Sequence, residues 1–570
     1  MANNVVVIAA ASFSLLLIIG ISTVAIVRYQ EAGTESAEAP ISAKPVVHST
    51  TKAIEEMCST TNYQDTCTTS LSDAMKESNT SSPEPKDIVK ASVAVISEQV
   101  ARVLNKSRLI KSKDPRIQGA LADCRELFGY AKKELITTMQ LMHVKSLEDI
   151  PKKSKEINNW ISAVLSYQQT CVDGFPEGPV KLKMEKIVEM TKQMSSNALA
   201  IISGIVSVLS VLDIDIDSLT SRKKSRKLMM DGEELPGWVT ETDRRHLMNM
   251  MKSQLVPNIT VAQDGTGNFT TILDAITSIP KHHEGRVVVY IKKGVYKESV
   301  LVRKENITIY GDGSAETVIT GCKNFIDGVR TFKTATFVAI GQGFVAVDIG
   351  FHNTAGAIKH QAVALRVQSD RAIFLKCRMY GYQDTLYAQT HRQFYRGCVI
   401  TGTIDFIFGD AAAVFQNCIL RVLKPLDNQK NIVTAHARID RLEETGFVIQ
   451  NCRIVPEKSL GEETEKRSFL GRPWREYSRT IVMESYIDGF ISPEGYMPWD
   501  GDFGLSTLLY GEYRNKGLGA KLGQRVTWPG FNILTRVQAD EYTVKNFIEG
   551  QDWVNKVGAP VPIRLGLFTD

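Results

Sequence analysis

The 570-residue sequence has little excess charge of either sign, because 68 Lys and Arg residues face 63 Asp and Glu residues, a formal net charge of +5. This mild excess suits a polyanionic partner but does not predict nucleic-acid binding, and no nucleic-acid-binding motif is found. The chain also lacks a His and Cys cluster with the spacing of metal ligands, so we expect no metal and no cofactor.

One long uncharged run stands at the N-terminus, where residues 5–27 are apolar and Arg28 follows. The run is long enough to span a bilayer and exceeds the hydrophobic region of a usual signal peptide. We therefore expect residues 1–30 to be a signal-anchor or a long signal peptide. The first four residues contain no Lys or Arg, which leaves both cleavage and membrane anchoring open.

Residues 52–212 carry apolar side chains at three- and four-residue spacing, the pattern of helices with one buried face. We expect an antiparallel four-helix bundle with helices over residues 87–110, 121–142, 154–170 and 180–212. The apolar run 198–212 is too short for a membrane span and is predicted to lie in the core of the bundle.

Residues 213–252 have a different character and contain a basic run over residues 221–229. A solvated linker explains such a run, and its exposure also makes it a good processing site. We predict that a protease cuts near Arg226 and Lys227, with Arg244-Arg245 as a weaker second site.

The pattern changes again over residues 253–558, where short β-branched runs and turns recur about every 20 residues. Such a repeat predicts a parallel β-helix, in which each coil adds one strand to a stack. A β-sandwich is the competing all-β fold, but its strands recur at shorter intervals. The chain is therefore predicted to be multidomain, with an α-helical bundle followed by an all-β parallel β-helix.

The nine cysteines are an odd number, so at least one thiol stays unpaired. After a secretory start, two disulfides are expected in the helical region, among Cys58, Cys67, Cys124 and Cys171. In the second half, Cys398 and Cys418 are spaced like residues on adjacent coils, which fits either a disulfide or two buried free thiols.

Five sequons for N-glycosylation agree with a secretory route, and they start at Asn79, Asn105, Asn258, Asn268 and Asn306. We therefore expect a secreted glycoprotein.

Two aspartates and two glutamines have the spacing of the predicted coils. Asp384 precedes Asp405 by 21 residues, Gln361 lies 23 residues before Asp384, and Gln383 is the residue directly before Asp384. Because neighbouring coils stack about 4.8 Å apart, residues one period apart can lie side by side on one face. We expect these four side chains to form such a row.

A row of two carboxyls and two amides favours ester hydrolysis. Two nearby carboxyls do not both ionise readily, so one stays charged and can attack while the other holds a proton and can donate it. Arg472 is the candidate for holding one of them charged. Amides can stabilise the oxygen that becomes negative when a carbonyl is attacked, whereas a glycosidase, which also uses two carboxyls, has no need of such donors.

Five blocks of the sequence resemble, in order, the signature blocks of plant pectin methylesterases. They are Gly-Val-Tyr-Lys-Glu (294–298), Gln-Ala-Val-Ala-Leu (361–365), Tyr-Gln-Asp-Thr-Leu-Tyr (382–387), Asp-Phe-Ile-Phe-Gly (405–409) and Leu-Gly-Arg-Pro-Trp (470–474). The helical region, with Cys58/Cys67 and Cys124/Cys171, is similar to the inhibitor domain that many of these enzymes carry as a pro-region.

The resemblance implies a right-handed parallel β-helix that hydrolyses the C6 methyl esters of homogalacturonan, the polymer of pectin, and releases methanol. It also implies secretion to the cell wall, and a pro-region that inhibits the enzyme of its own chain. Among the site residues it implies that Asp405 is the nucleophile of an acyl-enzyme, that Asp384 is the acid and then the base, and that Gln383 stabilises the transition state. The implied substrate contacts are Thr331, Gln361, Arg472 and Trp474.

Two positions depart from the family pattern. Tyr496 stands where the family usually has Trp, which predicts a smaller aromatic wall at one sugar subsite. Gly350 stands where some relatives have Cys, which puts a disulfide to Cys377 in doubt.

Two alternative functions would require different residues from those found in the sequence. A non-catalytic inhibitor or wall-binding protein would have lost the nucleophile or the acid, and both are present. A polysaccharide lyase on the same fold typically needs a Ca²⁺-binding acidic cluster, and none is found.

Overall fold

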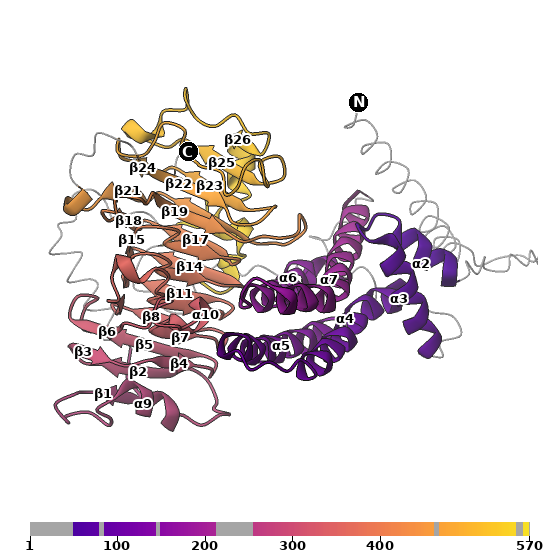
Figure 1. Cartoon of the computed structure of the whole chain (residues 1–570), viewed down its shortest axis with the longest axis horizontal. Helices are drawn as coiled ribbons and strands as arrows, with labels where there is room; N and C mark the ends of the chain where they lie inside the picture. Colours follow the sequence, from indigo (N-terminus) through magenta and orange to yellow (C-terminus); the bar gives the residue numbers. More distant parts are fainter. Residues whose placement is uncertain are drawn as a thin grey trace, which may run out of the picture. The chain divides into compact units, whose positions relative to one another are not determined.

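The computed structural model describes residues 50–78, 85–143, 149–211, 255–460, 467–554 and 563–568 (Figure 1). The chain divides into two units, Met1–Lys227 and Leu228–Asp570. The predicted N-terminal segment 1–30 and the predicted linker 213–252 lie outside the described residues. Within the described ranges, no helix has the length and apolar character needed to cross a membrane.

The first unit is helical. Its elements are α2 (Thr50–Cys58), α3 (Gln64–Glu77), α4 (Pro85–Arg108), α5 (Pro115–Leu141), α6 (Pro151–Asp173) and α7 (Pro179–Val211). The four long helices α4–α7 correspond to the four predicted ones, and each begins at a proline, which suits a first helical position because proline has no N–H to satisfy there. They pack in a closed order, α4 on α5, α5 on α6, α6 on α7 and α7 on α4, so the predicted bundle is confirmed.

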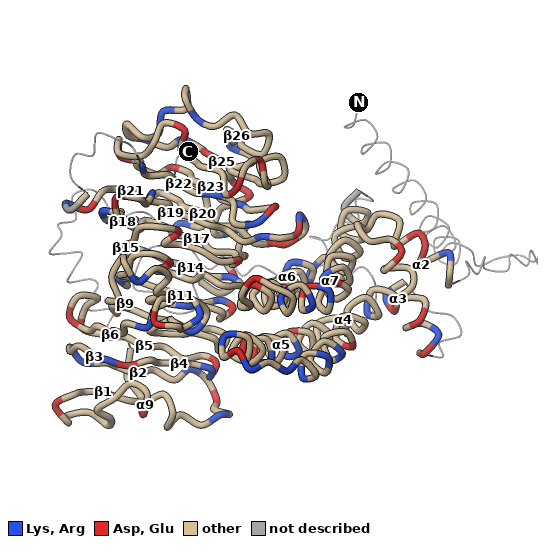
Figure 2. The backbone as a smooth tube through the Cα atoms, in the orientation of Figure 1, with Lys and Arg blue, Asp and Glu red and all other residues tan. Residues whose placement is uncertain are grey.

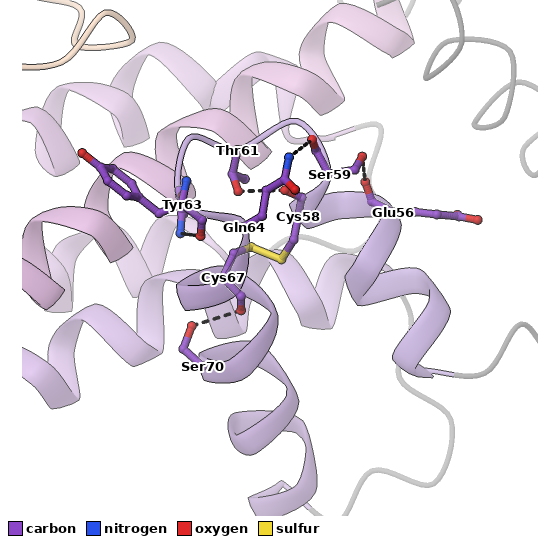
Figure 3. The surroundings of a disulfide bond; sticks show 9 residues. Glu56, Cys58, Ser59, Thr61, Tyr63, Gln64, Cys67 and Ser70 are labelled. Carbon is purple, nitrogen blue, oxygen red and sulfur yellow. Dashed lines mark hydrogen bonds between the residues drawn. A yellow bond between two sulfur atoms is a disulfide. The ribbon is translucent and has the colours of Figure 1, made fainter. Parts of the chain in front are cut away.

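Two disulfides tie this unit together. Cys58 at the end of α2 is bonded to Cys67 in α3, and Cys124 in α5 is bonded to Cys171 in α6. In the loop closed by the first bond, the Gln64 side chain donates to the Ser59 carbonyl at 2.7 Å (Figure 3). The short helices α2 and α3, which the periodicity did not predict, are thus fixed to each other.

The second unit is a parallel β-helix of three sheets in which every strand pair is parallel. The first sheet contains β1 (Ile259–Val261), β2 (Val287–Ile291), β5 (Ile307–Gly311), β8 (Val345–Val347), β11 (Ala372–Leu375), β14 (Arg392–Arg396), β17 (Ala412–Gln416), β20 (Gly446–Gln450), β23 (Arg479–Met483), β25 (Leu509–Tyr513) and β26 (Phe531–Ile533). The second contains β4 (Val300–Val302), β7 (Phe337–Ala339), β10 (Leu365–Val367), β13 (Leu386–Ala388), β16 (Ile407–Gly409), β19 (Asn431–His436) and β22 (Ser468–Pro473).

The third sheet contains β3 (Gly294–Lys297), β6 (Thr317–Gly321), β9 (Gly350–Asn353), β12 (Arg378–Tyr380), β15 (Val399–Gly402), β18 (Ile419–Val422), β21 (Arg453–Pro456) and β24 (Tyr486–Ile487). Short helices lie between or after the strands: α9 (Ile272–Ser278), α10 (Thr331–Thr334), α11 (Arg536–Asp540) and α12 (Val544–Phe547). Basic and acidic residues are interspersed along both units, as the small net charge suggests (Figure 2).

The core of the β-helix is built from side chains that repeat at one position of successive coils. Phe374, Tyr395 and Phe415 are in register, and their rings stack with centroids 4.9 and 4.7 Å apart. The turn after each of these strands has a left-handed residue, with φ of 51° at Lys376, 63° at Gly397 and 53° at Asn417. The repeat of the sequence is thus a repeat of both packing and backbone conformation.

Cys398 and Cys418 are buried free thiols, so the predicted option of a disulfide between them is wrong. They precede strands that pair in register, Val399 with Ile419, and residues in that relation lie about 4.8 Å apart, a spacing that allows a disulfide only if the two side chains turn toward each other. Each thiol lies instead against a carbonyl of an earlier coil, 3.4 Å from Phe374 O and 3.5 Å from Tyr395 O respectively. Cys377 is also free and buried.

The N-terminal edge of the first sheet is covered by Asn268, through both its side chain and its backbone, and by Phe269, which bridges to Val261. Thr260 in the edge strand β1 donates its N–H to Asn268 Oδ1 at 2.8 Å, and its carbonyl accepts from Asn268 N at 2.7 Å. Asn268 thereby occupies backbone groups that a neighbouring strand would otherwise use.

Candidate active site

The predicted row of polar residues lies just before strands of the second sheet. Asp384 is two residues before β13 and Asp405 is two residues before β16, and the pairing of Leu386 with Ile407 places the two aspartates at the same point of adjacent coils. Asp384 N also donates to Ile404 O at 3.0 Å. One coil earlier, Ala362 N donates to Gln383 O at 3.2 Å, so Gln361 and Gln383 lie in adjacent coils as well.

Both aspartates have left-handed backbone conformations, with φ of 64° at Asp384 and 47° at Asp405. Residues other than glycine seldom adopt this region, although aspartate tolerates it better than most. Strain of this kind gathers at functional sites, where the surrounding structure holds it.

Arg472 makes a two-point contact with Asp405. Its Nε donates to Oδ1 at 2.9 Å, and its Nη2 donates to Oδ2. Arg472 lies in β22, two strands from β16, and the strand between them presents only the small Ala435 in the same register. The arginine can therefore reach across one coil to the carboxylate.

Burial and charge separate the two carboxyls electrostatically. Burial raises the pKa of Asp384 well above its usual value, and the charge of Asp405 raises it further. Burial also raises the pKa of Asp405, but the charge and hydrogen bonds of Arg472 oppose that rise. Asp405 therefore ionises before Asp384, and the pair can hold one proton on Asp384.

The amides and the other predicted contacts are spread around this pair. Gln361 and Gln383 are half-buried, and Gln361 Oε1 is enclosed without a hydrogen-bond partner in the described parts of the chain. Thr331 begins α10, and this helix is joined to the segment after Gln361 by a hydrogen bond from Val363 N to Thr334 Oγ1 at 3.1 Å. Trp474 directly follows β22 and is half-buried.

Aromatic rings line the same row. Tyr387 and Phe408, each three residues after one of the aspartates, stack with centroids 4.3 Å apart, and Phe408 lies 5.9 Å from Trp474. Trp499 continues the row, with its ring 6.4 Å from Trp474 and 4.1 Å from the Arg472 guanidinium. Trp499 was not predicted from the sequence, although it lies 25 residues after Trp474, as Tyr496 does after its partner Gly471.

Tyr496 is not part of this row, so the predicted change of a sugar subsite wall is wrong. Its side chain is buried in the core, with ring centroids 4.8 Å from Tyr510 and 5.8 Å from Phe531. Three residues later, Trp499 is the aromatic residue that faces outward.

A parallel β-helix that carries adjacent carboxyls, an arginine and amides on one face has the construction of a carboxylic ester hydrolase. The family model described as Pectinesterase matches residues 258–551, and the one described as Plant invertase/pectin methylesterase inhibitor matches residues 52–201. The chain therefore belongs to the pectinesterase family and carries an inhibitor-like region before its catalytic part.

Relatives match both parts. "Putative pectinesterase/pectinesterase inhibitor 45" of Arabidopsis thaliana is 43% identical over 522 residues, which cover 91% of this chain and 85% of the relative. "Pectinesterase 1" of Citrus sinensis is 38% identical over 533 residues, which cover 90% and 88% respectively. The structure of "Pectin methylesterase from Carrot" is 48% identical, with a TM-score of 0.54, and the match covers 55% of this chain and 99% of that one. The resemblance drawn from the five sequence blocks and the right-handed parallel β-helix are thereby confirmed.

Proposed function

We propose that the chain hydrolyses the C6 methyl esters of homogalacturonan through an acyl-enzyme on Asp405. The observation that carries this proposal is the two-point contact between Arg472 and Asp405. This contact favours the charged form of Asp405, and a carboxylate must be charged to attack an ester carbonyl.

In the first step, a carboxylate oxygen of Asp405 bonds to the ester carbonyl carbon and the bond from that carbon to the methoxy oxygen breaks. Asp384 gives its proton to the departing methoxy oxygen, and methanol leaves. In the second step, water attacks the acyl carbon while Asp384, now charged, takes a proton from it. The bond to Asp405 breaks, and free galacturonate and the original enzyme result.

The amides of Gln383 and Gln361 are proposed to donate hydrogen bonds to the carbonyl oxygen as it becomes negative. Thr331, Gln361, Arg472 and Trp474 are proposed to contact the pectin chain. The ring of Trp474 offers an apolar face for a sugar, and Arg472 suits the carboxylates of a demethylated stretch. No step requires a metal or a cofactor.

The helical region is proposed to inhibit the β-helix of the same chain until a protease cuts the basic linker near Arg226 and Lys227. A tether raises the effective concentration of the bundle, so that even weak inhibition would act before cleavage. We propose the division 1–30, 52–212, 213–252 and 253–558 for the anchor or signal, the bundle, the linker and the enzyme. The mature enzyme would be secreted to the cell wall, with the N-terminal segment holding the precursor in the membrane unless it is removed.

The experiment is methanol release from methylated pectin by the secreted enzyme and by its Asp405→Asn variant. An amide cannot form the acyl-enzyme, so the variant should lose several orders of magnitude in rate, on the order of 7 kcal/mol of barrier. Circular dichroism and melting temperature serve as the controls for folding. A variant that stays within about tenfold of the wild type would contradict the role of Asp405.

A further inference from the structure

A second pair of carboxyls, Asp410 and Glu443, is buried behind the active-site row. Asp410 directly follows β16, the strand that begins after Asp405, and Glu443 lies in the segment 437–445 between β19 and β20, which we term the brace loop. Their exposed fractions are 3% and 1%. Neither residue has a part in the proposed reaction.

Each carboxyl has one oxygen that accepts hydrogen bonds and one that does not. Asp410 Oδ1 accepts from Thr445 Oγ1 at 2.8 Å, and Glu443 Oε1 accepts from the N–H groups of Ile439 at 3.0 Å and Asp440 at 2.7 Å. Asp410 Oδ2 and Glu443 Oε2 are buried, and no N–H or O–H group in the described ranges donates to them. The ionisation of each carboxyl acts on that of the other, and a hydrogen bond between the two would require a proton on one of them.

The charged groups around the pair do not neutralise it directly. Arg438 donates from Nε to the Glu443 carbonyl at 3.0 Å, and Arg479 donates from Nη1 to the Thr445 carbonyl at 2.9 Å, so both guanidinium groups serve backbone carbonyls. Both still attract the pair at longer range, whereas the charge of Asp440 opposes ionisation of Glu443.

The remaining neighbour is His436, whose Nε2 lies 3.9 Å from Asp410 Oδ1. Burial lowers the pKa of this histidine well below its usual value, so it is neutral and gives Asp410 no cation. Its Nδ1 accepts from the N–H groups of Arg438 at 3.4 Å and Arg479 at 3.3 Å, which leaves the proton of the ring on Nε2.

The brace loop touches the segment that carries the proposed substrate contacts. His436, just before the loop, pairs in register with Pro473, which lies between Arg472 and Trp474. Within the loop, Arg438 O accepts from Tyr477 N at 3.1 Å, and Arg438 Nη1 donates to Tyr477 O at 3.4 Å. A change in the conformation of the brace loop would therefore move residues 472–477.

We propose that Asp410 and Glu443 share one proton, and that this protonated pair is a positioning contact that holds the brace loop and, through it, Arg472 and Trp474. The proposal rests on the proposed function, in which Arg472 and Trp474 contact pectin. Loss of the shared proton leaves two buried negative charges side by side, and their repulsion loosens the loop. Substrate binding then weakens as the pH rises, and KM increases.

The pH range follows from the environment of the pair. Burial raises the pKa of Asp410 to about 7, with the hydrogen bonds of Glu443 and Thr445 acting in the opposite direction. Burial and the charge of Asp410 raise the pKa of Glu443 well above its usual value. The pair thus passes from one shared proton to none above neutral pH, and the effect on KM is expected there.

The test is KM and kcat of the secreted enzyme on methylated pectin from about pH 5 to about pH 9, for the wild type and for Asp410→Asn, Glu443→Gln and their combination. Each single variant keeps the contact between positions 410 and 443 without a shared proton. The NH₂ group of the new amide stands where Asp410 Oδ2 or Glu443 Oε2 was, and it can donate to the remaining carboxylate. In the double variant two NH₂ groups face each other and the contact is lost. Glu444→Gln, in the same loop and only half-buried, is the matched control for a lost charge.

We expect the KM of the wild type to rise roughly fivefold above neutral pH, and the KM of each single variant to stay flat with kcat near the wild-type value. The double variant should have a raised KM at every pH, and Glu444→Gln should follow the wild type. A wild-type KM that is flat with pH, a pH-dependent rise that persists in Asp410→Asn, or a double variant as good as the singles would overturn the proposal.

A readout independent of turnover separates this proposal from the proposed function. The infrared carbonyl band of a protonated carboxyl should be present near pH 6 in the wild type and reduced in Asp410→Asn. If that band difference is found but Trp474→Ala leaves KM unchanged, the substrate role of Trp474 fails while the shared proton stands. If the band is the same in both proteins, the shared proton itself is contradicted.

Discussion

Arg472 and Asp405 lie 67 residues apart in the sequence and meet in a two-point ion pair, with Nε 2.9 Å from Oδ1 and Nη2 on Oδ2. Within the described part of the chain, the neighbouring Asp384 has only the more distant charge of the same arginine to favour its ionisation. One cation thus gives two adjacent buried carboxyls different protonation states, which is the division between nucleophile and acid that the proposed mechanism needs.

Replacing Arg472 with Lys should move the acidic limb of the pH profile of kcat/KM to higher pH. Arg472 lowers the pKa of Asp405 against the effect of burial, and a lysine provides one point of contact instead of two. The pKa of Asp405 then rises, so a higher pH is needed to charge it, by about one pH unit. Arg453→Lys, a change on the third sheet, should leave the profile unchanged, and an unshifted acidic limb in Arg472→Lys would argue against the charged nucleophile.

Gln383→Ala should lower kcat by roughly 10²–10³, the effect of removing one donor to a developing oxyanion, and should change KM less. Steady-state kinetics on methylated pectin measure both constants. Gln263→Ala removes an exposed amide in the first coil and serves as the control. If only KM changed in Gln383→Ala, this residue would bind substrate without stabilising the transition state.

Asp370→Asn should destabilise the β-helix by about 3 kcal/mol, because it leaves the buried Arg392 without its full counter-charge. Arg392 donates to Asp370 Oδ1 at 3.0 Å and Oδ2 at 2.7 Å, and to Glu549 Oε2 at 2.9 Å. Glu549→Gln, on the more exposed partner, should cost less than about 1 kcal/mol. Urea unfolding followed by tryptophan fluorescence measures the free energy of unfolding of both variants. Equal losses of stability in Asp370→Asn and Glu549→Gln would contradict the prediction that Asp370 matters more.

The ion pair of Asp370 and Arg392 also predicts how the stability of the β-helix depends on pH. Although burial favours the neutral acid, the charge and hydrogen bonds of Arg392 hold the pKa of Asp370 well below its usual value. A depressed folded-state pKa stabilises the fold above the unfolded value of about 3.9, and this contribution is lost as the pH falls below it. Asp370→Asn should therefore flatten the acid side of the stability curve, and an unchanged slope would exclude this source.

Replacing Arg226 and Lys227 with Ser should give an uncut, poorly active precursor that is retained in the secretory pathway. The bundle then stays tethered at high effective concentration. Immunoblots of wall and microsomal fractions, with methanol release from each, measure the outcome. The same change at Arg244 and Arg245, the weaker predicted site, should reduce cleavage less. If the uncut protein reaches the wall with full activity, the helical region is a folding or targeting aid and not an inhibitor.

The β-helix was predictable because its repeat is local. A period of about 20 residues in the sequence sets which residues stack, and Asp384 and Asp405 could be placed side by side from that period alone. The bundle was predictable for a similar reason, since each helix has its own apolar face and its own proline start.

Contacts that depend on side-chain direction could not be predicted in this way. The spacing of Cys398 and Cys418 is right for stacking, but it does not reveal that both thiols turn toward backbone carbonyls. Tyr496 and Trp499 are both aromatic and three residues apart, and only the turn of the chain decides which is core and which faces outward. Asp410 and Glu443 meet because the long connection of the brace loop folds back, and no fixed period describes that connection.

The covered edge at β1 has a consequence for the enzyme at high protein concentration. A stack of parallel strands with an open end is a template on which a second molecule can add its own strands, and repeated addition gives a fibre. Asn268 occupies both backbone groups of Thr260 at that end, and the sequons at Asn258 and Asn268 lie beside the same strand. This end of the β-helix therefore works against end-to-end polymerisation when the protein is concentrated.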